Sequence, residues 1–278
     1  MFARRPPRLR RIALLAAPII ALAAAITIDT GGSAHAQAGR EARPTIVLVH
    51  GDWADASSWN SEIRSLQGRG YKVVAPPNPL RGPLEDAAYL RSYLQTISGP
   101  IVLVAHSYGG FVITNAATGN PNIKALVYID SFIPERGDTL LALTSTWHSC
   151  VDQSALTPVP SAGAVDLYLR WEPNPPYPGY RKCFANGVGA TKAAILFATQ
   201  RPGAAAEFTE PSGSPAWRSI PSWSLIGTRD HVIPRPLQEF MSSRAGAHVT
   251  HVVAGHLSLI TQPRVVTGVI LAAVHATR

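Results

Sequence analysis

Cysteine and charge are both scarce in this sequence. Of its 278 residues only two are cysteine, and Asp, Glu, Lys and Arg together make up 15%. So few cysteines exclude a disulfide-dense miniprotein, and low charge combined with 46% hydrophobic residues excludes a chain kept disordered by its own charge. The sequence also lacks the Gly-X-Y period of collagen and any other internal repeat. These absences leave a folded globular protein.

The positive charge is concentrated near the N-terminus. The formal net charge is +8, but residues 1–36 hold five of the 25 basic residues and one of the 17 acidic residues, which leaves +4 for residues 37–278. A charge this small, scattered along the chain, argues against a nucleic-acid partner.

The first 36 residues have the order of an export signal. Five arginines precede the apolar run Ile12–Ile28, and the small-residue site Ala-His-Ala follows at positions 34–36. We therefore expect cleavage after Ala36 and a secreted or periplasmic mature chain. A membrane anchor is the alternative, but a 17-residue run that contains Pro18 is at the short end of what spans a bilayer, so we expect no stable anchor. The paired arginines before the run leave Sec and twin-arginine export both open.

Residues 37–278 predict one large α/β domain. Nearly continuous apolar runs are typical of parallel strands buried on both faces, and segments of helical periodicity separate them. Trp59, Ile63 and Leu66 mark one such helix, and a second runs through residues 87–97 before Gly-Pro. We therefore expect a doubly wound sheet of about six mainly parallel strands with helices on both faces. The predicted strands are Thr45–Val49, Tyr71–Ala75, Ile101–Ala105, Ala125–Ile129, Ser222–Ile226 and Val249–Val253.

A long interval interrupts this alternation after the fourth strand. Residues 131–221 are rich in proline and aromatic residues, and we interpret them as a lid insertion, because an unstructured loop of that length is improbable in a compact domain. Helices are expected around Asp166–Trp171 and Thr191–Thr199. The interval contains both cysteines, and an even pair in an exported chain predicts one disulfide, Cys150–Cys183. Two thiols alone make a poor metal site, so no metal is expected.

The clearest chemical signal is a serine at a strand-to-helix turn. The apolar run from Ile101 ends in Ala-His-Ser-Tyr-Gly-Gly at residues 105–110, with Ser107 at the apex. This matches the nucleophile elbow G-x-S-x-G, with Ala105 in place of the first glycine. A small side chain is what that position requires, so the substitution is compatible with the motif. Ser107 is the candidate nucleophile.

A serine hydroxyl needs a base within hydrogen-bond reach and a third group that orients the base. His256 follows the sixth predicted strand and Asp230 follows the fifth, so both are expected at the carboxyl edge of the sheet, where open α/β sheets bind ligands. Asp130, at the end of the fourth strand, competes for the acid role. We favour Asp230 because its loop lies next to the histidine loop, and Asp130 is then expected to cap the start of the lid.

The oxyanion that forms during attack on a carbonyl needs two donors already in place. One is the backbone N–H of Tyr108, directly after the nucleophile, and the other comes from the loop after the first strand. We assign the second donor to the N–H of Asp52, with Trp53 as the alternative. The Asp52 side chain is expected to face solvent or the rim of the pocket, because a carboxylate would oppose a developing oxyanion.

Four motifs in this order carry a resemblance to a known family. They are His-Gly-Asp-Trp at residues 50–53, the elbow around Ser107, Gly-Thr-Arg-Asp at residues 227–230, and Gly-His at residues 255–256. Together they resemble the small α/β-hydrolase branch of plant methylesterases, hydroxynitrile lyases and bacterial carboxylesterases, from about Thr45 to the C-terminus. The resemblance implies the α/β-hydrolase fold and hydrolysis of carboxylic esters through an acyl-enzyme, without a cofactor. The chain departs from the branch at Ala105, at Asp52 and in its cysteine-bearing lid.

We therefore expect an exported serine esterase that acts on small-molecule esters through Ser107, His256 and Asp230. The aromatic lid indicates an apolar or aromatic substrate group. One alternative is a hydroxynitrile lyase, which uses the same three residue types for C–C cleavage. The other is a ligand-binding sensor on the same fold, which turnover of p-nitrophenyl esters would distinguish from an esterase.

Overall fold

The computed structural model describes residues 43–161 and 163–277, which belong to one compact unit. The predicted export signal at residues 1–36 lies outside the described residues. No helix within the described ranges is long and apolar enough to cross a bilayer.

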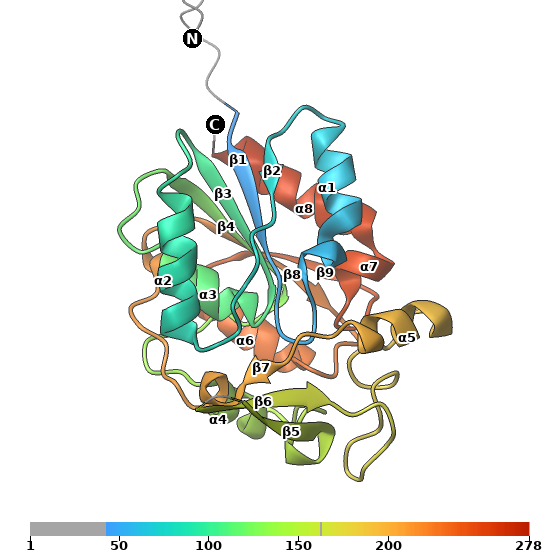
Figure 1. Ribbon diagram of the computed structural model, residues 1–278. Coiled ribbons are helices and arrows are strands. Elements are labelled where there is room, and N and C mark those ends of the chain that lie inside the picture. Colours follow the sequence, from blue (N-terminus) through green and yellow to red (C-terminus); the bar gives the residue numbers. More distant parts are fainter. Residues whose placement is uncertain (1–42, 162, 278) are drawn as a thin grey trace, which may run out of the picture. The chain divides into compact units, whose positions relative to one another are not determined.

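Six parallel strands form the central sheet, in the order β2-β1-β3-β4-β8-β9 (Figure 1). Every residue of β1 and β3 is buried, because helices cover both faces of the sheet, and most of these side chains are therefore apolar. The bounds of the strands are β1 Thr45–Val49, β2 Val73–Val74, β3 Ile101–Ser107, β4 Ile123–Ser131, β8 Ser222–Gly227 and β9 His248–Val252.

The sequence prediction of six parallel strands is confirmed, with changes at the strand ends. The second strand shrinks to two residues, because only Val73 and Val74 pair with β1. The third strand is longer than expected and carries the chain to Ser107 itself, which pairs with Ser131 at the end of β4. The serine is therefore fixed by the sheet up to the turn.

Helices pack on both faces of the sheet. In Figure 1, α2 and α3 lie on one face, and α1 and α8 lie on the other. The predicted periodic segments correspond to α1 and α2, and α2 ends at Leu94, short of the last predicted apolar position at Ile97. The bounds of the helices outside the insertion are η1 Ala56–Trp59, α1 Asn60–Gln67, α2 Pro83–Leu94, α3 Gly109–Ala116, α6 Arg235–Arg244, α7 Ser258–Thr261 and α8 Pro263–Ala276.

Residues 132–221, between β4 and β8, form the insertion, which lies beyond the carboxyl ends of the central strands (Figure 1). It contains a second, antiparallel sheet in the order β5-β6-β7. Its elements are α4 Leu140–Thr146, η2 Gln153–Ala155, β5 Leu156–Ser161, β6 Ala164–Leu169, α5 Ala190–Ala198, β7 Gly203–Ala204, η3 Ala205–Phe208 and η4 Ala216–Arg218.

One of the two helix predictions in the insertion is wrong. Asp166–Trp171 was expected to be helical, but residues 164–169 form strand β6, which pairs with β5 along its whole length. Val165, Leu167 and Leu169 alternate with other residues, and that period of two is typical of a strand. The other predicted helix, Thr191–Thr199, corresponds to α5.

The two cysteines form the predicted disulfide. Cys150 and Cys183 are bonded, with their Cα atoms 5.8 Å apart. The bond joins the segment after α4 to the segment before α5.

Candidate active site

Ser107 lies at a tight turn between β3 and α3. Its φ of 55° is in the left-handed region, which non-glycine residues rarely adopt and which lifts the side chain out of the sheet. The turn needs glycine directly after it, because a Cβ on Gly109 would lie 2.8 Å from the carbonyl of Val49 and one on Gly110 would collide with the carbonyl of Phe132. The strand, turn and helix expected of a nucleophile elbow are thus all present.

The structure brings His256 and Asp230 to this serine. His256 Nε2 lies 2.9 Å from Ser107 Oγ, and His256 Nδ1 lies 2.9 Å from Asp230 Oδ2. All three side chains are buried. Asp230 comes from the loop after β8, residues 228–234, which we call the acid loop. His256 comes from residues 253–257 after β9, which we call the base loop.

Asp230 is held by donors on both of its oxygens. Oδ1 accepts from the backbone N–H groups of Val232 and Ile233, at 2.8 and 3.0 Å, and Oδ2 accepts from Gln238 Nε2 at 2.9 Å as well as facing His256. Burial raises the pKa of Asp230, while the two backbone N–H groups lower it by favouring the carboxylate. Burial lowers the pKa of His256 to about 3, so that its ring is neutral near pH 7. A neutral imidazole oriented by a carboxylate can accept a proton from a serine.

Asp130, the competing acid, does not reach the histidine. It is fully buried, and its two oxygens accept from the backbone N–H groups of Gly227 and Ser258 at 2.7 and 3.0 Å. The expectation that Asp130 caps the start of the lid is wrong, because its donors are Gly227, the last residue of β8, and Ser258, the first residue of α7. Asp130 instead ties together the residue directly before the acid loop and the residue directly after the base loop.

The loop after β1 lies directly against the elbow. A Cβ on Gly51 would lie 2.6 Å from Ser107 Cβ and 3.0 Å from the backbone nitrogen of Tyr108, so the two predicted oxyanion segments are in contact. The N–H of Trp53, the alternative donor, is committed to the carbonyl of Arg201 at 2.9 Å. This leaves Asp52 as the donor that we favour on this loop.

The side chain of Asp52 is not where we expected it. It is 2% exposed, rather than facing solvent or the pocket rim, and it lies close to the carboxyl group of Glu207 from the insertion, beside Gly203. Two carboxyl groups can bond only if one carries a proton. Burial raises the pKa of both groups, and Asp86 nearby adds to the effect. The partner was invisible in the sequence because Glu207 is 155 positions away from Asp52 along the chain.

Several supporting side-chain contacts around the site were not predicted from the sequence. His106 Nε2 bonds to the carbonyl of His256 at 2.8 Å, and the backbone N–H of Asn78 donates to His50 Nε2 at 3.1 Å. Tyr108 Oη donates to Asp86 at 2.6 Å, which ties the elbow to α2. Of these residues, His50 and His106 were the ones whose place in or beside a motif could have indicated a role near the site.

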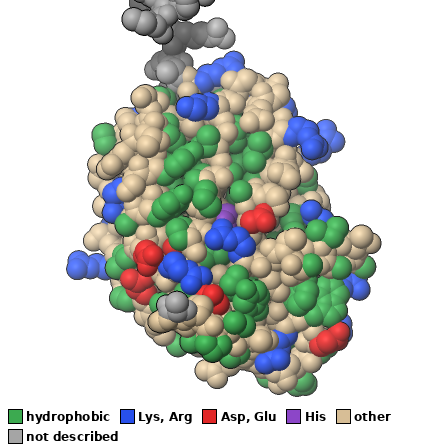
Figure 2. Space-filling model, in the orientation of Figure 1, with side chains coloured by type: hydrophobic (Ala, Val, Ile, Leu, Met, Phe, Trp, Pro, Cys, Tyr) green, Lys and Arg blue, Asp and Glu red, His purple; other side chains and the backbone are tan. Residues whose placement is uncertain are grey.

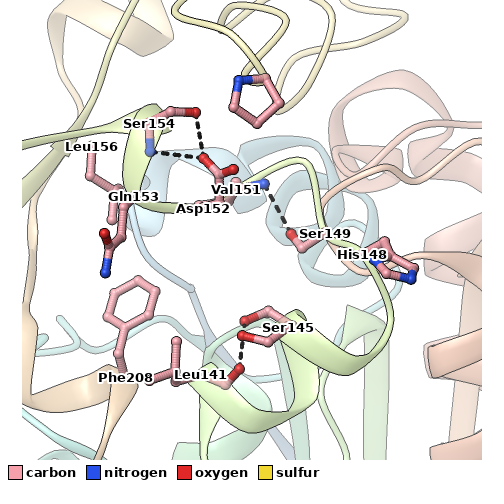
Figure 3. Close-up of a pocket in the computed structure, with 12 residues that line it drawn as sticks. Leu141, Ser145, His148, Ser149, Val151, Asp152, Gln153, Ser154, Leu156 and Phe208 are labelled. Atoms are coloured by element: carbon pink, nitrogen blue, oxygen red, sulfur yellow. Dashed lines mark hydrogen bonds between the residues drawn. The ribbon is translucent and has the colours of Figure 1, made fainter.

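The described residues also contain a cavity within the insertion, away from Ser107 (Figure 3). It has a volume of about 570 Å³ and mixes hydroxyl groups with apolar side chains, including Leu141, Ser145 and Phe208. In these same ranges, no group of three or more His, Cys, Asp and Glu residues is arranged so that it could hold a metal ion. On the face in Figure 2, acidic and basic side chains intermingle.

The parallel sheet, the serine elbow and the order of Ser107, Asp230 and His256 along the strands are those of the α/β-hydrolase fold. Residues 46–269 match the alpha/beta hydrolase family, and the chain belongs to that family.

Solved structures of other proteins share this fold, including a hydrolase and an esterase. A pyrethroid hydrolase from Sphingobium faniae JZ-2 superposes with a TM-score of 0.67 at 17% identity, over 84% of this chain and 98% of that one. Polyneuridine aldehyde esterase superposes with a TM-score of 0.68 at 19% identity, over 83% of this chain and 99% of that one. The resemblance inferred from the motifs is confirmed at the level of family and fold.

A curated relative is similar over a shorter stretch. A carbendazim-hydrolyzing esterase from Nocardioides sp. (strain SG-4G) is 34% identical over 110 residues, which cover 35% of this chain and 46% of that protein. The match therefore spans less than half the length of that relative.

Proposed function

We propose that this protein is a serine hydrolase that cleaves carboxylic esters through an acyl-enzyme. Ser107 attacks the ester carbonyl while His256 takes its proton, and His256 then returns a proton to the leaving alcohol. Water repeats the cycle on the acyl-enzyme. Asp230 keeps the proton on His256 Nδ1 and stabilises the imidazolium ion, so that Nε2 can act as the base.

The observation that carries this proposal is the continuous bonding from Asp230 through His256 to Ser107, with 2.9 Å at both links. The backbone N–H of Tyr108 follows the serine directly, and that of Asp52 belongs to the loop that packs against the elbow through Gly51. These are the two donors that would stabilise the oxyanion. Similarity to proteins named as esterases and hydrolases supports the same reaction class.

The experiment is a turnover screen with p-nitrophenyl esters graded by acyl length. We expect the wild-type protein to hydrolyse members of the panel and Ser107→Ala to lose several orders of magnitude in kcat, because the covalent step is lost. A fluorophosphonate should add one equivalent at Ser107, located by mass spectrometry. Labelling at another residue, or a fully active Ser107→Ala, would refute the assignment.

Export belongs to the same proposal. We infer that residues 1–36 direct export and are removed after Ala36. The disulfide is compatible with an oxidising compartment. Mass measurement of the protein recovered outside the cytoplasm should give a chain that starts at Gln37, and an intact N-terminus there would contradict cleavage.

A further inference from the structure

The disulfide joins two short segments that both contact the loops of the proposed triad. One segment is Ser149–Cys150 and the other is Cys183–Asn186, and together we call them the brace. The role inferred for the brace rests on the proposed function, because it concerns how Asp230 and His256 are held in position.

The first segment binds the acid loop from outside. The backbone N–H of Cys150 donates to the carbonyl of His231 at 2.8 Å, and Ser149 Oγ donates to the carbonyl of Val232 at 2.6 Å. Each of these carbonyls belongs to a peptide group whose N–H donates to Asp230 Oδ1. Hydrogen bonds in such a chain polarise one another, so the brace both fixes these N–H groups and strengthens their hold on the carboxylate.

The second segment binds both loops at once. Asn186 Nδ2 donates to the carbonyl of Arg229 in the acid loop at 2.6 Å, and Asn186 Oδ1 accepts from the backbone N–H of His256 at 3.4 Å. A Cβ on Gly255 would collide with Asn186, so the base loop approaches this side chain as closely as glycine allows. Asn186 is therefore a bridge between the acid and the base.

Phe184 adds a packing contact in the same segment. Its ring is 1% exposed, and its centroid lies 5.3 Å from that of His256 and 5.8 Å from that of Trp53 in the loop after β1. Neighbouring Cys183 is fully buried. The disulfide thus holds a segment that touches all three loops around Ser107.

The other sulfur is within reach of solvent. Cys150 is half-buried and lines a cavity of about 480 Å³ together with Trp147, Lys182 and His231. A small dithiol can enter a cavity of this size. It would transfer two electrons to the S–S bond, giving two cysteine thiols and an oxidised, disulfide form of the reductant.

We propose that Asn186 is a positioning residue for the Asp230–His256 pair, kept in place by the Cys150–Cys183 disulfide. Without the bridge, both loops can shift, and a displacement of about 1 Å in a catalytic group costs on the order of 100-fold in rate. The bridge consists of hydrogen bonds between Asn186 and the backbone of the two loops, and it is not expected to contact the substrate. Its loss should therefore lower kcat and leave KM little changed.

The test compares Asn186→Ala with Asn174→Ala in the full-length protein. Asn174 is a matched control, because its side-chain Nδ2 also donates to a backbone carbonyl inside the insertion, that of Ser154 at 2.9 Å, but it touches neither loop. We expect Asn186→Ala to lose about 10- to 100-fold in kcat, with KM within threefold (roughly half a decade) of wild type. We expect Asn174→Ala to keep the wild-type kcat. Equal losses in the two variants, or a wild-type kcat in Asn186→Ala, would overturn the proposal.

A second readout needs no substrate. A histidine Nδ1–H bonded to a carboxylate gives a proton resonance far downfield, and we expect this signal to broaden or shift in Asn186→Ala and to persist in Asn174→Ala. If no ester is hydrolysed and Ser107 is not labelled, the proposed function fails, while this resonance still decides whether Asn186 positions the pair. An unchanged resonance in Asn186→Ala would refute the bridge.

Reduction of the wild-type protein tests the disulfide even if Asn186→Ala fails to fold. Dithiothreitol should lower kcat about 10-fold or more, with the same change in the resonance, and reoxidation should restore both. Circular dichroism should stay unchanged, because the central sheet does not depend on the bond. Full kcat and an unchanged resonance in protein shown to carry two free thiols would exclude the disulfide from this role.

Discussion

Replacing Asp230 or Asp130 by asparagine separates the acid of the proposed triad from a structural carboxylate. In Asp230→Asn, Oδ1 can still accept from the two backbone N–H groups of the acid loop. The new Nδ2 then faces both His256 Nδ1 and Gln238 Nε2, which are donors to Asp230 in the wild type. To avoid two donors facing each other, the ring must move its proton to Nε2, and it can no longer accept the serine proton.

The expected loss follows from that change of tautomer. We expect kcat to fall about 10³- to 10⁴-fold, equivalent to about 4–5.5 kcal/mol of transition-state stabilisation. In Asp130→Asn, one of the two backbone N–H groups bonded at 2.7 and 3.0 Å loses its acceptor. That costs about 1–3 kcal/mol in the free energy of unfolding, with kcat within about 10-fold of wild type.

The assay combines steady-state kinetics, measured well below the melting temperature of each variant, with urea unfolding of both variants. Far-ultraviolet circular dichroism checks that each is folded. Equal kcat losses in the two variants, or a larger loss in Asp130→Asn, would show that the reasoning from the 2.9 Å bond is wrong.

Three further predictions concern pH and reaction class. Both carboxyl oxygens of Glu62 are buried without a hydrogen-bond partner among the described residues, and burial raises its pKa to about 8. The folded protein therefore keeps a proton that the unfolded chain releases above about pH 4.5, so stability falls as the pH rises towards 8. Glu62→Gln should add about 3 kcal/mol to the free energy of unfolding at pH 7 and little at pH 4, and an equal gain at both pH values in urea unfolding would contradict this. Because burial lowers the pKa of His256 to about 3, kcat/KM should persist below pH 6, and an acidic limb near 6.5 in the pH–rate profile would show otherwise. Leu257, beside the histidine, is buried and offers no charge to a departing cyanide, so mandelonitrile at mildly acidic pH should release no more cyanide than buffer does. Release above buffer that disappears in Ser107→Ala would instead favour a lyase.

Local sequence patterns were sufficient to predict the central sheet and the turn at Ser107. Nearly continuous apolar runs of strand length located the central strands to within a few residues, because strands buried on both faces favour apolar side chains at most positions. Ser107 was found because a strand, a small residue and two glycines around one serine meet a steric demand that lies within ten residues of sequence. Motif order then placed Asp230 and His256 at the same edge.

The sequence alone determined the fold class, the candidate nucleophile and the pairing of two cysteines, because each depends on neighbours along the chain or on counting. Tertiary structure decided the rest. Only it showed that Asp130 binds backbone N–H groups instead of His256, and that Asp52 turns inward to meet Glu207. Only it placed Asn186 between the acid and base loops. These contacts join residues 43 to 155 positions apart, and burial, which sets whether a carboxyl group keeps its proton, exists only once the chain has folded.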